Sequence, residues 1–197
     1  MSIQEIFSVP IYKIKLDLDV KKLQSFCNKY QHEDIVGKIK SNNGGYHSSD
    51  LPLDDVNLQP LIEEIETHSS QFAKTFISKN KQILDNMWFN INLYKDFNIA
   101  HRHVGDDISG VYYVKTPHEC GHIIFEHPAQ GIFDYYYFNV ENPEEMNVYN
   151  ARIWWMPVEV NMLYLFPAWL KHSVEANKNK TEERISIAFN TYHERNI

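Results

Sequence analysis

The sequence predicts a mainly β fold of the α+β class, in which an antiparallel sandwich or barrel is supported by helices near the N-terminus. After residue 86, short runs of aromatic and β-branched residues alternate with turn residues, which is typical of antiparallel strands. Before residue 86, two stretches instead carry apolar residues at helical spacing. The 197 residues are 43% hydrophobic, which suits one substantial core. We therefore expect a single domain over 1–197, with 1–85 as support and 86–197 as the core.

The segments before residue 86 are expected to alternate between extended, helical and turn structure. They are an edge strand or two over 6–18, a helix over 19–30, a turn region over 40–55 and a longer helix over 57–80. Pro10 suits an edge strand because it cannot donate to a neighbouring strand. Asp19 suits the N-cap of the first helix.

The runs that predict the β-core are apolar, short and bounded by turn residues. They are MWFNINLY (87–94), ISGVYYV (108–114), HIIFEH (122–127), IFDYYYFNV (132–140), ARIWWMPV (151–158), VNMLYLFP (160–167) and RISIAFNTY (184–192). Seven such runs at these intervals favour a sandwich or a barrel over a helical fold.

Charge and cysteine content narrow the class of protein. Lys and Arg number 19 against 26 Asp and Glu, a net charge of −7, which disfavours nucleic acid as a partner without excluding a local basic groove. The sequence has no run of roughly 20 apolar residues and no signal-peptide layout at its start. Two cysteines are too few for a disulfide framework. We therefore expect a cytoplasmic protein with no membrane partner.

The stretch HECGH (118–122) has the letters of a zinc-peptidase motif. That motif requires a helix, which places two histidines four residues apart on one face, with the glutamate beside the metal-bound water. Here Gly121 lies inside the motif and both flanks are strand-like. A hairpin with exposed polar residues is the favoured interpretation of His118, Glu119 and His122, although His122 could still reach the interior.

A second histidine pair fits a strand. His101 and His103 are two residues apart, so in a β-strand both side chains point to the same face. A third histidine facing them would complete a metal site, and His172 follows directly after a dense apolar run. The three histidines therefore predict a metal centre inside the β-core.

Arg184 opens an otherwise apolar strand and shares a face with Ser186. A guanidinium buried there needs an anionic partner. A carboxylate bound in two-point fashion would provide it, with the Ser186 hydroxyl as an added donor. The partner could be a ligand, or it could be a protein carboxylate such as Glu182 or Asp134.

Four segments carry a resemblance to a known family. They are SNNGGYHSSDL (41–51), MWFNINLYKDFNIAHRHVGDDISGVYYVKTP (87–117), GHIIFEHP (121–128) and MPVEVNMLYLFPAWLKHSVEANKNKTEERISIAFN (156–190). Together they resemble the iron(II)/2-oxoglutarate-dependent oxygenases, and more narrowly a group of these oxygenases found in phage and bacteria. The resemblance covers more than half of the chain, and its late segment is the most specific. It implies a double-stranded β-helix (jelly roll), ferrous iron, and 2-oxoglutarate and O₂ as cosubstrates.

The resemblance also assigns roles to individual residues. His101 resembles the first metal ligand and His172 the distal one. Arg184 and Ser186 resemble the pair that binds the remote carboxylate of 2-oxoglutarate. Asn92 and Tyr94 resemble an N-x-Y element that helps to bind 2-oxoglutarate in some relatives, and Asn190 is a further candidate on the strand of Arg184.

The chain departs from the family pattern at the acidic ligand, because His103 stands where relatives usually carry Asp or Glu. His103 could itself bind the metal, since imidazole suits iron. Alternatively, Asp106 or Asp107 could reach in from the turn, or the position could be left to water or halide. We favour His103, which has the most direct strand geometry. A neutral ligand there leaves the iron centre one charge more positive.

The predicted function is an Fe(II)- and 2-oxoglutarate-dependent dioxygenase that hydroxylates an unknown substrate and releases succinate and CO₂. A non-catalytic jelly-roll module that binds a metal or ligand is the alternative, and a zinc peptidase acting through HECGH is a third. The substrate could be a protein side chain or a small molecule. A homodimer is expected by analogy with other jelly rolls. Several aromatic residues could line the pocket or fill the core: Trp88, Tyr112, Tyr113, Tyr135, Tyr136, Trp154 and Trp155.

Overall fold

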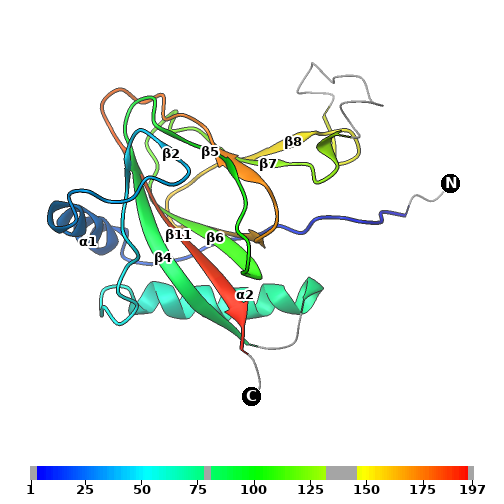
Figure 1. Cartoon of the computed structure of the whole chain (residues 1–197), viewed down its shortest axis with the longest axis horizontal. Helices are drawn as coiled ribbons and strands as arrows, with labels where there is room; N and C mark the ends of the chain where they lie inside the picture. Colours follow the sequence, from blue (N-terminus) through cyan, green and yellow to red (C-terminus); the bar gives the residue numbers. More distant parts are fainter. Residues whose placement is uncertain (1–3, 78–80, 132–145, 195–197) are drawn as a thin grey trace.

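The computed structural model describes residues 4–77, 81–131 and 146–194 (Figure 1). The helices in these ranges are α1 (Val20–Glu33) and α2 (Gln59–Phe76). The strands are β1 (Tyr12–Lys15), β2 (Asn42–Asn43), β3 (Tyr46–His47), β4 (Gln82–Asn92), β5 (Phe97–His101), β6 (Ile108–Lys115), β7 (Ile123–Glu126), β8 (Ile153–Met156), β9 (Met162–Pro167), β10 (His172–Val174) and β11 (Arg184–His193). The strand expected over 132–140, with Asp134, Tyr135 and Tyr136, lies outside the described residues.

The strands form two antiparallel sheets. The six-stranded sheet has the order β1-β9-β6-β11-β4-β3, and the five-stranded sheet has the order β2-β5-β10-β7-β8. From β4 to β7 the chain changes sheet at every step, and from β8 to β11 it does so again. This alternation between two sheets is the arrangement of a jelly roll. The predicted mainly β, α+β fold is confirmed.

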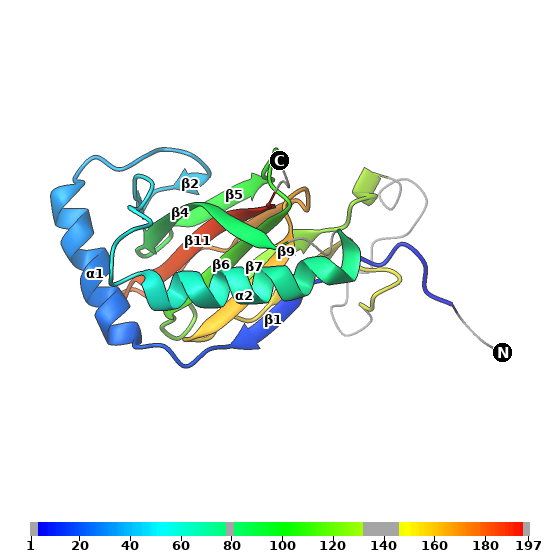
Figure 2. The ribbon, with the colours of Figure 1, turned by 90° about the horizontal axis from the view of Figure 1, so that it is seen from below.

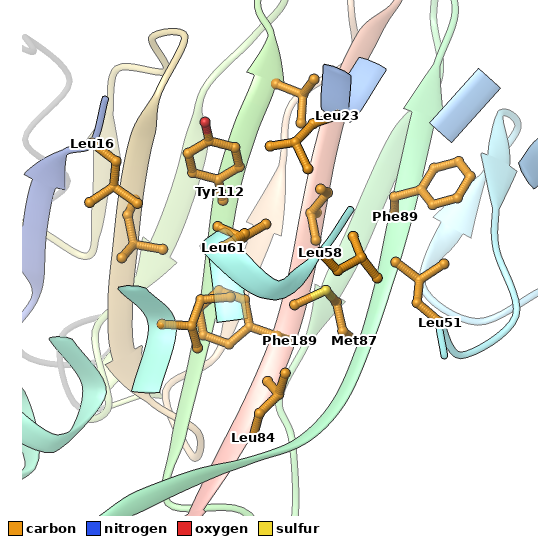
Figure 3. Packing of buried hydrophobic residues seen from close by; sticks show 14 of the residues in the cluster. Leu16, Leu23, Leu51, Leu58, Leu61, Leu84, Met87, Phe89, Tyr112 and Phe189 are labelled. Atoms are coloured by element: carbon orange, nitrogen blue, oxygen red, sulfur yellow. The ribbon is translucent and has the colours of Figure 1, made fainter. Parts of the chain in front are cut away.

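One face of the six-stranded sheet packs against the helices, and α2 runs across it in Figure 2. Successive side chains of a strand point to opposite faces, so Met87 and Phe189 turn toward α2. Leu58 and Leu61, at the start of α2, pack over them (Figure 3). Leu23 of α1 joins the same cluster. The helical segments before residue 86 therefore share one core with the β-strands.

The opposite face of this sheet turns toward the five-stranded sheet. Tyr164 and Phe166 of β9 pack there with Phe125 of β7 in a second apolar cluster. The same face of β4 and β11 carries polar or amphipathic side chains instead of aliphatic ones: Trp88, Asn90, Asn92, Arg184 and Ser186. The helices thus stabilise one side of the sheet, while the other side is available for a binding site.

The N-terminal elements lie close to the predicted positions. Asp19 is the N-cap of α1, and its carboxylate accepts hydrogen bonds from the backbone N–H groups of Lys21 and Lys22, each at 3.1 Å. The edge strand is confirmed as β1, which pairs with β9, but it covers only four residues of the predicted 6–18. Neither described helix has the length and apolarity of a membrane span.

Residues 41–47 form a strap that links the two sheets at one end. Within it, β2 pairs with β5 of the five-stranded sheet, and β3 pairs with β4 of the six-stranded sheet. Gly44 and Gly45, between these strands, have φ angles of +71° and +63°, which side-chain-bearing residues rarely adopt. The sequence predicted this region only as turns. The strap places His47 against the face of the sheet that carries Trp88.

The stretch HECGH is not a helix. It connects β6 to β7, with a turn at His118 and Glu119 and positive φ angles at Glu119 (59°) and Gly121 (84°). The predicted hairpin is wrong, because β6 and β7 belong to different sheets and do not pair with each other. A Cβ at Gly121 would lie 2.9 Å from Glu175, so the connection runs tightly against the segment after β10.

Candidate metal centre and cosubstrate site

Three histidines meet between the two sheets. His101 ends β5 and pairs in register with His172, which begins β10. The ligand-capable atoms of His101, His103 and His172 all lie within 4.8 Å of one another. Within residues 4–77, 81–131 and 146–194, this is the one group of three or more His, Cys, Asp or Glu residues with that geometry. The cluster that the sequence predicted is therefore assembled in the fold.

Hydrogen bonds fix the orientation of two of these rings. The Nδ1 atom of His101 lies 2.8 Å from the carbonyl oxygen of Ile99, and that of His172 lies 2.9 Å from the carbonyl oxygen of Leu170. A carbonyl oxygen only accepts, so each Nδ1 carries the proton and each Nε2 keeps a lone pair. This arrangement is common in metal-binding histidines, because the second nitrogen orients the ring.

His103 is held differently. It lies just beyond the end of β5, where its backbone N–H donates to the carbonyl oxygen of Ala168 at 2.9 Å. Its ring stacks on His172, with centroids 5.3 Å apart and planes 10° apart, and on Trp88 at 5.7 Å and 29°. Among the described residues, no group makes a hydrogen bond to the ring of His103.

Burial keeps the three imidazoles neutral. It lowers the pKa of His101, lowers that of His103 to about 4, and lowers that of His172 to about 3. Repulsion by a protonated His101 contributes further to the low pKa values of His103 and His172. Because metal ions bind neutral imidazole, the cluster is ready for a metal at neutral pH.

The two alternative acidic ligands lie outside the cluster. The Asp107 carboxylate accepts hydrogen bonds from the backbone N–H of His193 at 2.7 Å and from the Gln82 amide at 3.3 Å, and its Oδ2 lies 2.7 Å from His193 Nδ1. Burial, together with Asp85 and Asp107, raises the pKa of Asp106 to about 6. Neither carboxylate belongs to the group around His101 and His172.

Arg184 is fully buried, with 0% of its surface exposed. Its Nη1 donates to the carbonyl oxygens of Cys120 and Glu175, the latter at 3.0 Å, while Nε and Nη2 have no hydrogen-bond partner in the part of the chain that the structure describes. Glu182 pairs with Lys115 instead, and Asp134 lies outside the described residues. A buried guanidinium with two free donors and no carboxylate bonded to it has the chemistry of an anion site.

The sheet register places other unpaired polar groups beside Arg184. Asn92 is opposite Arg184, and Ser186 lies between Asn90 and Tyr113 on the neighbouring strands. Buried polar atoms nearly always have hydrogen-bond partners. Several here have none within residues 4–77, 81–131 and 146–194: Asn90 Oδ1, both amide atoms of Asn92 and the Tyr113 hydroxyl. Burial raises the pKa of Tyr113, which keeps its hydroxyl protonated as a donor. These groups fit a buried polar ligand with a carboxylate next to Arg184.

Two of the predicted cosubstrate residues, Tyr94 and Asn190, are not among the unpaired groups beside Arg184, although Asn190 lines the outer of two cavities that reach the histidines. Tyr94 follows the end of β4, is 43% exposed and has Lys95 Nζ 5.3 Å from its ring centroid, so it does not reach the interior. Asn190 is buried, but its amide is engaged by Ser109 at 2.7 Å and Asn86 at 2.9 Å. Sequence reasoning missed Asn90, although the alternation from Trp88 to Asn92 along one strand face was a signal for it.

Two neighbouring cavities with shared lining residues reach the histidine cluster. The inner one, of about 40 Å³, is lined by all three histidines and by Asn90, Tyr113 and Ser186. The outer one, of about 690 Å³, opens to solvent and shares Trp88, His101 and His103 with the inner cavity. It is also lined by His47, Lys38 and Lys40. A molecule in the outer cavity would therefore lie next to the candidate metal centre.

HECGH does not form a metal site. The side chain of His118 is 91% exposed, and His122 Nδ1 lies 2.7 Å from the Glu175 carboxylate on the outside of the protein. His122 therefore does not reach the interior. The zinc-peptidase hypothesis is not supported by this geometry, because the motif lacks the helix that it requires.

Comparison with known families gives the class of the protein. Residues 86–190, more than half of the chain, match a family described as "Putative 2OG-Fe(II) oxygenase". The chain therefore belongs to the 2-oxoglutarate/Fe(II)-dependent oxygenases. Its cofactor is Fe(II), and its cosubstrates are 2-oxoglutarate and O₂. A comparison with curated proteins finds no match.

Solved structures with a similar fold are enzymes of the same class. A prolyl-4-hydroxylase from Pseudomonas putida has a TM-score of 0.66 and 11% identity, with 95% of each chain covered. The viral collagen prolyl hydroxylase from Paramecium bursaria Chlorella virus-1 has a TM-score of 0.59 and 12% identity, with 92% of this chain and 94% of that chain covered. HygX from Streptomyces hygroscopicus, solved with nickel and 2-oxoglutarate, has a TM-score of 0.59 and 11% identity, covering 94% and 83%. The predicted jelly-roll fold is thus confirmed.

Proposed function

We propose that this oxygenase hydroxylates a C–H bond of an organic substrate, with Fe(II) held by His101, His103 and His172. Arg184 would hold the remote carboxylate of 2-oxoglutarate. The single observation that carries the proposal is a buried Arg184 with two unpaired donors, on the same sheet face as residues that line the cavity of the three histidines. When bound, iron, 2-oxoglutarate and O₂ supply the oxidising chemistry, and 2-oxoglutarate leaves as succinate and CO₂.

The three histidines would present neutral nitrogen ligands to the metal. The Nε2 atoms of His101 and His172 are free because their Nδ1 atoms donate to backbone carbonyls. With His103 as the third ligand, the protein contributes no negative charge, so a bound Fe(II) keeps its full +2 charge. This favours anionic cosubstrates at the remaining coordination positions.

The polar groups beyond the histidines would orient 2-oxoglutarate. Arg184 can donate two hydrogen bonds through Nε and Nη2, and the Tyr113 hydroxyl is a third free donor. Asn92 supplies a further amide next to Arg184, and Ser186 and Asn90 lie on the path toward the histidines. Because these groups are buried, they also exclude water from the cosubstrate.

The outer cavity is the proposed entrance for the primary substrate. Its volume of about 690 Å³ is large enough for a small molecule or for one side chain of a peptide. Among the proteins of similar fold, one prolyl hydroxylase was solved with a peptide fragment, so a protein side chain is the first substrate class to test. The expected product carries one additional oxygen atom, which mass spectrometry detects.

Two broader properties also belong to the proposal. Cys27 and Cys120 are both buried and unpaired, which suits the reducing conditions of the cytoplasm. A homodimer is proposed by analogy with other jelly rolls, and light scattering on the purified protein would test it.

The function is tested by following succinate formation from 2-oxoglutarate with and without Fe(II). We expect Fe(II)-dependent succinate in the wild type and none in His172→Ala. Arg184→Gln removes charged hydrogen bonds and should raise the KM for 2-oxoglutarate about 10- to 100-fold. His118→Ala removes an exposed histidine outside the site and should match the wild type.

Two results would contradict the proposal. Tight binding of 2-oxoglutarate without succinate formation would indicate a non-catalytic binding module. Peptidase activity that disappears in Glu119→Ala would instead support the HECGH hypothesis.

A further inference from the structure

The three candidate ligands are not oriented in the same way. His101 and His172 each donate Nδ1–H to the carbonyl oxygen two residues earlier in the chain. His103 makes no such bond among the described residues. Another interaction must therefore hold the imidazole plane of His103 if this residue is to bind a metal.

Ring stacking supplies that constraint. The Trp88 ring lies close to two imidazoles at small interplanar angles: His47 at 5.7 Å and 7°, and His103 at 5.7 Å and 29°. His103 then stacks on His172 at 5.3 Å and 10°. The four rings therefore form a chain of successive ring contacts, here called the column, from the outer cavity to the histidine cluster.

The outer end of this column is anchored. His47 Nδ1 lies 2.9 Å from the carbonyl oxygen of Ser48, and the carbonyl oxygen of His47 accepts from the backbone N–H of Lys38 at 2.7 Å. His47 is buried and belongs to β3, so it moves with the strap rather than with a free loop. Trp88 is fixed in β4, opposite Ala188 of β11. The column can therefore transmit a fixed orientation to His103.

We propose that Trp88 is a positioning residue for His103, and that His47 in turn holds the Trp88 ring in place. This inference rests on the proposed function only in that His103 is taken as a metal ligand. Stacking here replaces the outer hydrogen bond that usually orients a metal-binding histidine, and loss of such outer support typically weakens metal binding about tenfold or more.

A double-mutant cycle on metal affinity tests the proposal. Co(II) binding is titrated without 2-oxoglutarate, in the wild type, Trp88→Leu, His103→Ala and the double variant. We expect Trp88→Leu to weaken binding about tenfold when His103 is present and to have almost no effect in the His103→Ala background. The visible absorption of bound Co(II) should change in the same variants, because it reports the ligand set. Trp88→Phe keeps an aromatic ring and should restore most of the affinity.

Two further variants keep the test decisive. Trp155→Leu removes a partly exposed tryptophan on β8, outside the column, and should leave Co(II) affinity unchanged. If Trp88→Leu does not fold, His47→Leu removes the ring that holds Trp88 without altering β4, and it should weaken binding in the same direction. Urea unfolding of each metal-free variant checks that the fold is retained.

The outcomes separate this inference from the proposed function. Equal losses from Trp88→Leu with and without His103 would overturn it, because the tryptophan would then have only a general structural role. Unchanged affinity in Trp88→Leu would also overturn it, while leaving His103 as a ligand of the proposed oxygenase. Unchanged affinity in His103→Ala would overturn both this inference and the role of His103 in the proposed ligand set, leaving an oxygenase with a different third ligand. A wild type that binds neither Co(II) nor Fe(II) would contradict both.

Discussion

Among single residues, burial determines the pKa values and the hydrogen-bond partners of the polar groups in the candidate site. Arg184 is fully buried and its pKa is lowered by burial, yet no carboxylate among the described residues hydrogen-bonds to it. The sequence placed Arg184 and Ser186 on one strand face, and it correctly raised the need for an anionic partner. It could not show that Glu182 forms an ion pair with Lys115, because this contact depends on β6 lying next to β11.

The buried histidines predict a stability that falls in acid. Their folded-state pKa values lie below the ordinary value of 6.5, so the unfolded chain binds more protons as pH falls below 6.5. Stability is thus fully present above pH 6.5, and it is lost as pH falls toward about 4 for His103 and about 3 for His172. At pH 5 each of the two should cost about 2 kcal/mol relative to pH 7 and above.

Asp106 opposes this trend, since its raised pKa favours the folded state as pH falls below about 6. We expect the two histidines to outweigh this single carboxyl. Urea unfolding of the metal-free protein at pH 7 and pH 5 measures the net effect. His172→Gln should show a smaller loss between the two pH values than the wild type, and an equal loss would exclude His172 as a source of the acid sensitivity.

Among the strands, pairing between segments that are far apart in sequence determines which side chains meet in the candidate site. Period-two alternation correctly predicted the inward face of β11 and the strand character of β6. It did not predict that β6 and β7 separate into different sheets, or that β4 ends before Tyr94. Alternation defines the faces of a strand, whereas the end of a strand depends on where its neighbours stop.

The strap offers a direct test at this scale. A Cβ at Gly44, where φ is +71°, would overlap the Asp96 carboxylate, and Asp96 also accepts the Leu93 N–H at 2.7 Å. Gly44→Ala should therefore lower the free energy of unfolding by about 1–3 kcal/mol, measured by urea denaturation. Gly105→Ala reports the cost of a positive φ (+110°) without a contact, because nothing lies within 4 Å of its Cβ position. An unchanged free energy of unfolding in Gly44→Ala would show that neither the backbone conformation nor the contact with Asp96 restricts Gly44.

In the whole molecule, the apolar core under the helices and the candidate site lie on opposite faces of the six-stranded sheet. Helices cover one face of the six-stranded sheet (Figures 1 and 2). The other face carries Arg184 and Ser186 and turns toward the histidine cluster at β5 and β10 of the five-stranded sheet. Composition and periodicity were sufficient to predict the α+β class, and the resemblance supplied the jelly roll. The meeting of His101 with His172 could not come from spacing, because 70 intervening residues must first fold into two sheets.

The central claim is that one site holds the metal on three histidines and 2-oxoglutarate on Arg184. A crystal structure of the protein with Mn(II) and 2-oxoglutarate tests it most directly, with anomalous scattering to locate the metal. We expect the metal bound to Nε2 of His101 and His172 and to the ring of His103, and a carboxylate of 2-oxoglutarate hydrogen-bonded to Arg184. A metal ligated by Asp106 or Asp107, or 2-oxoglutarate bound away from Arg184, would contradict the account.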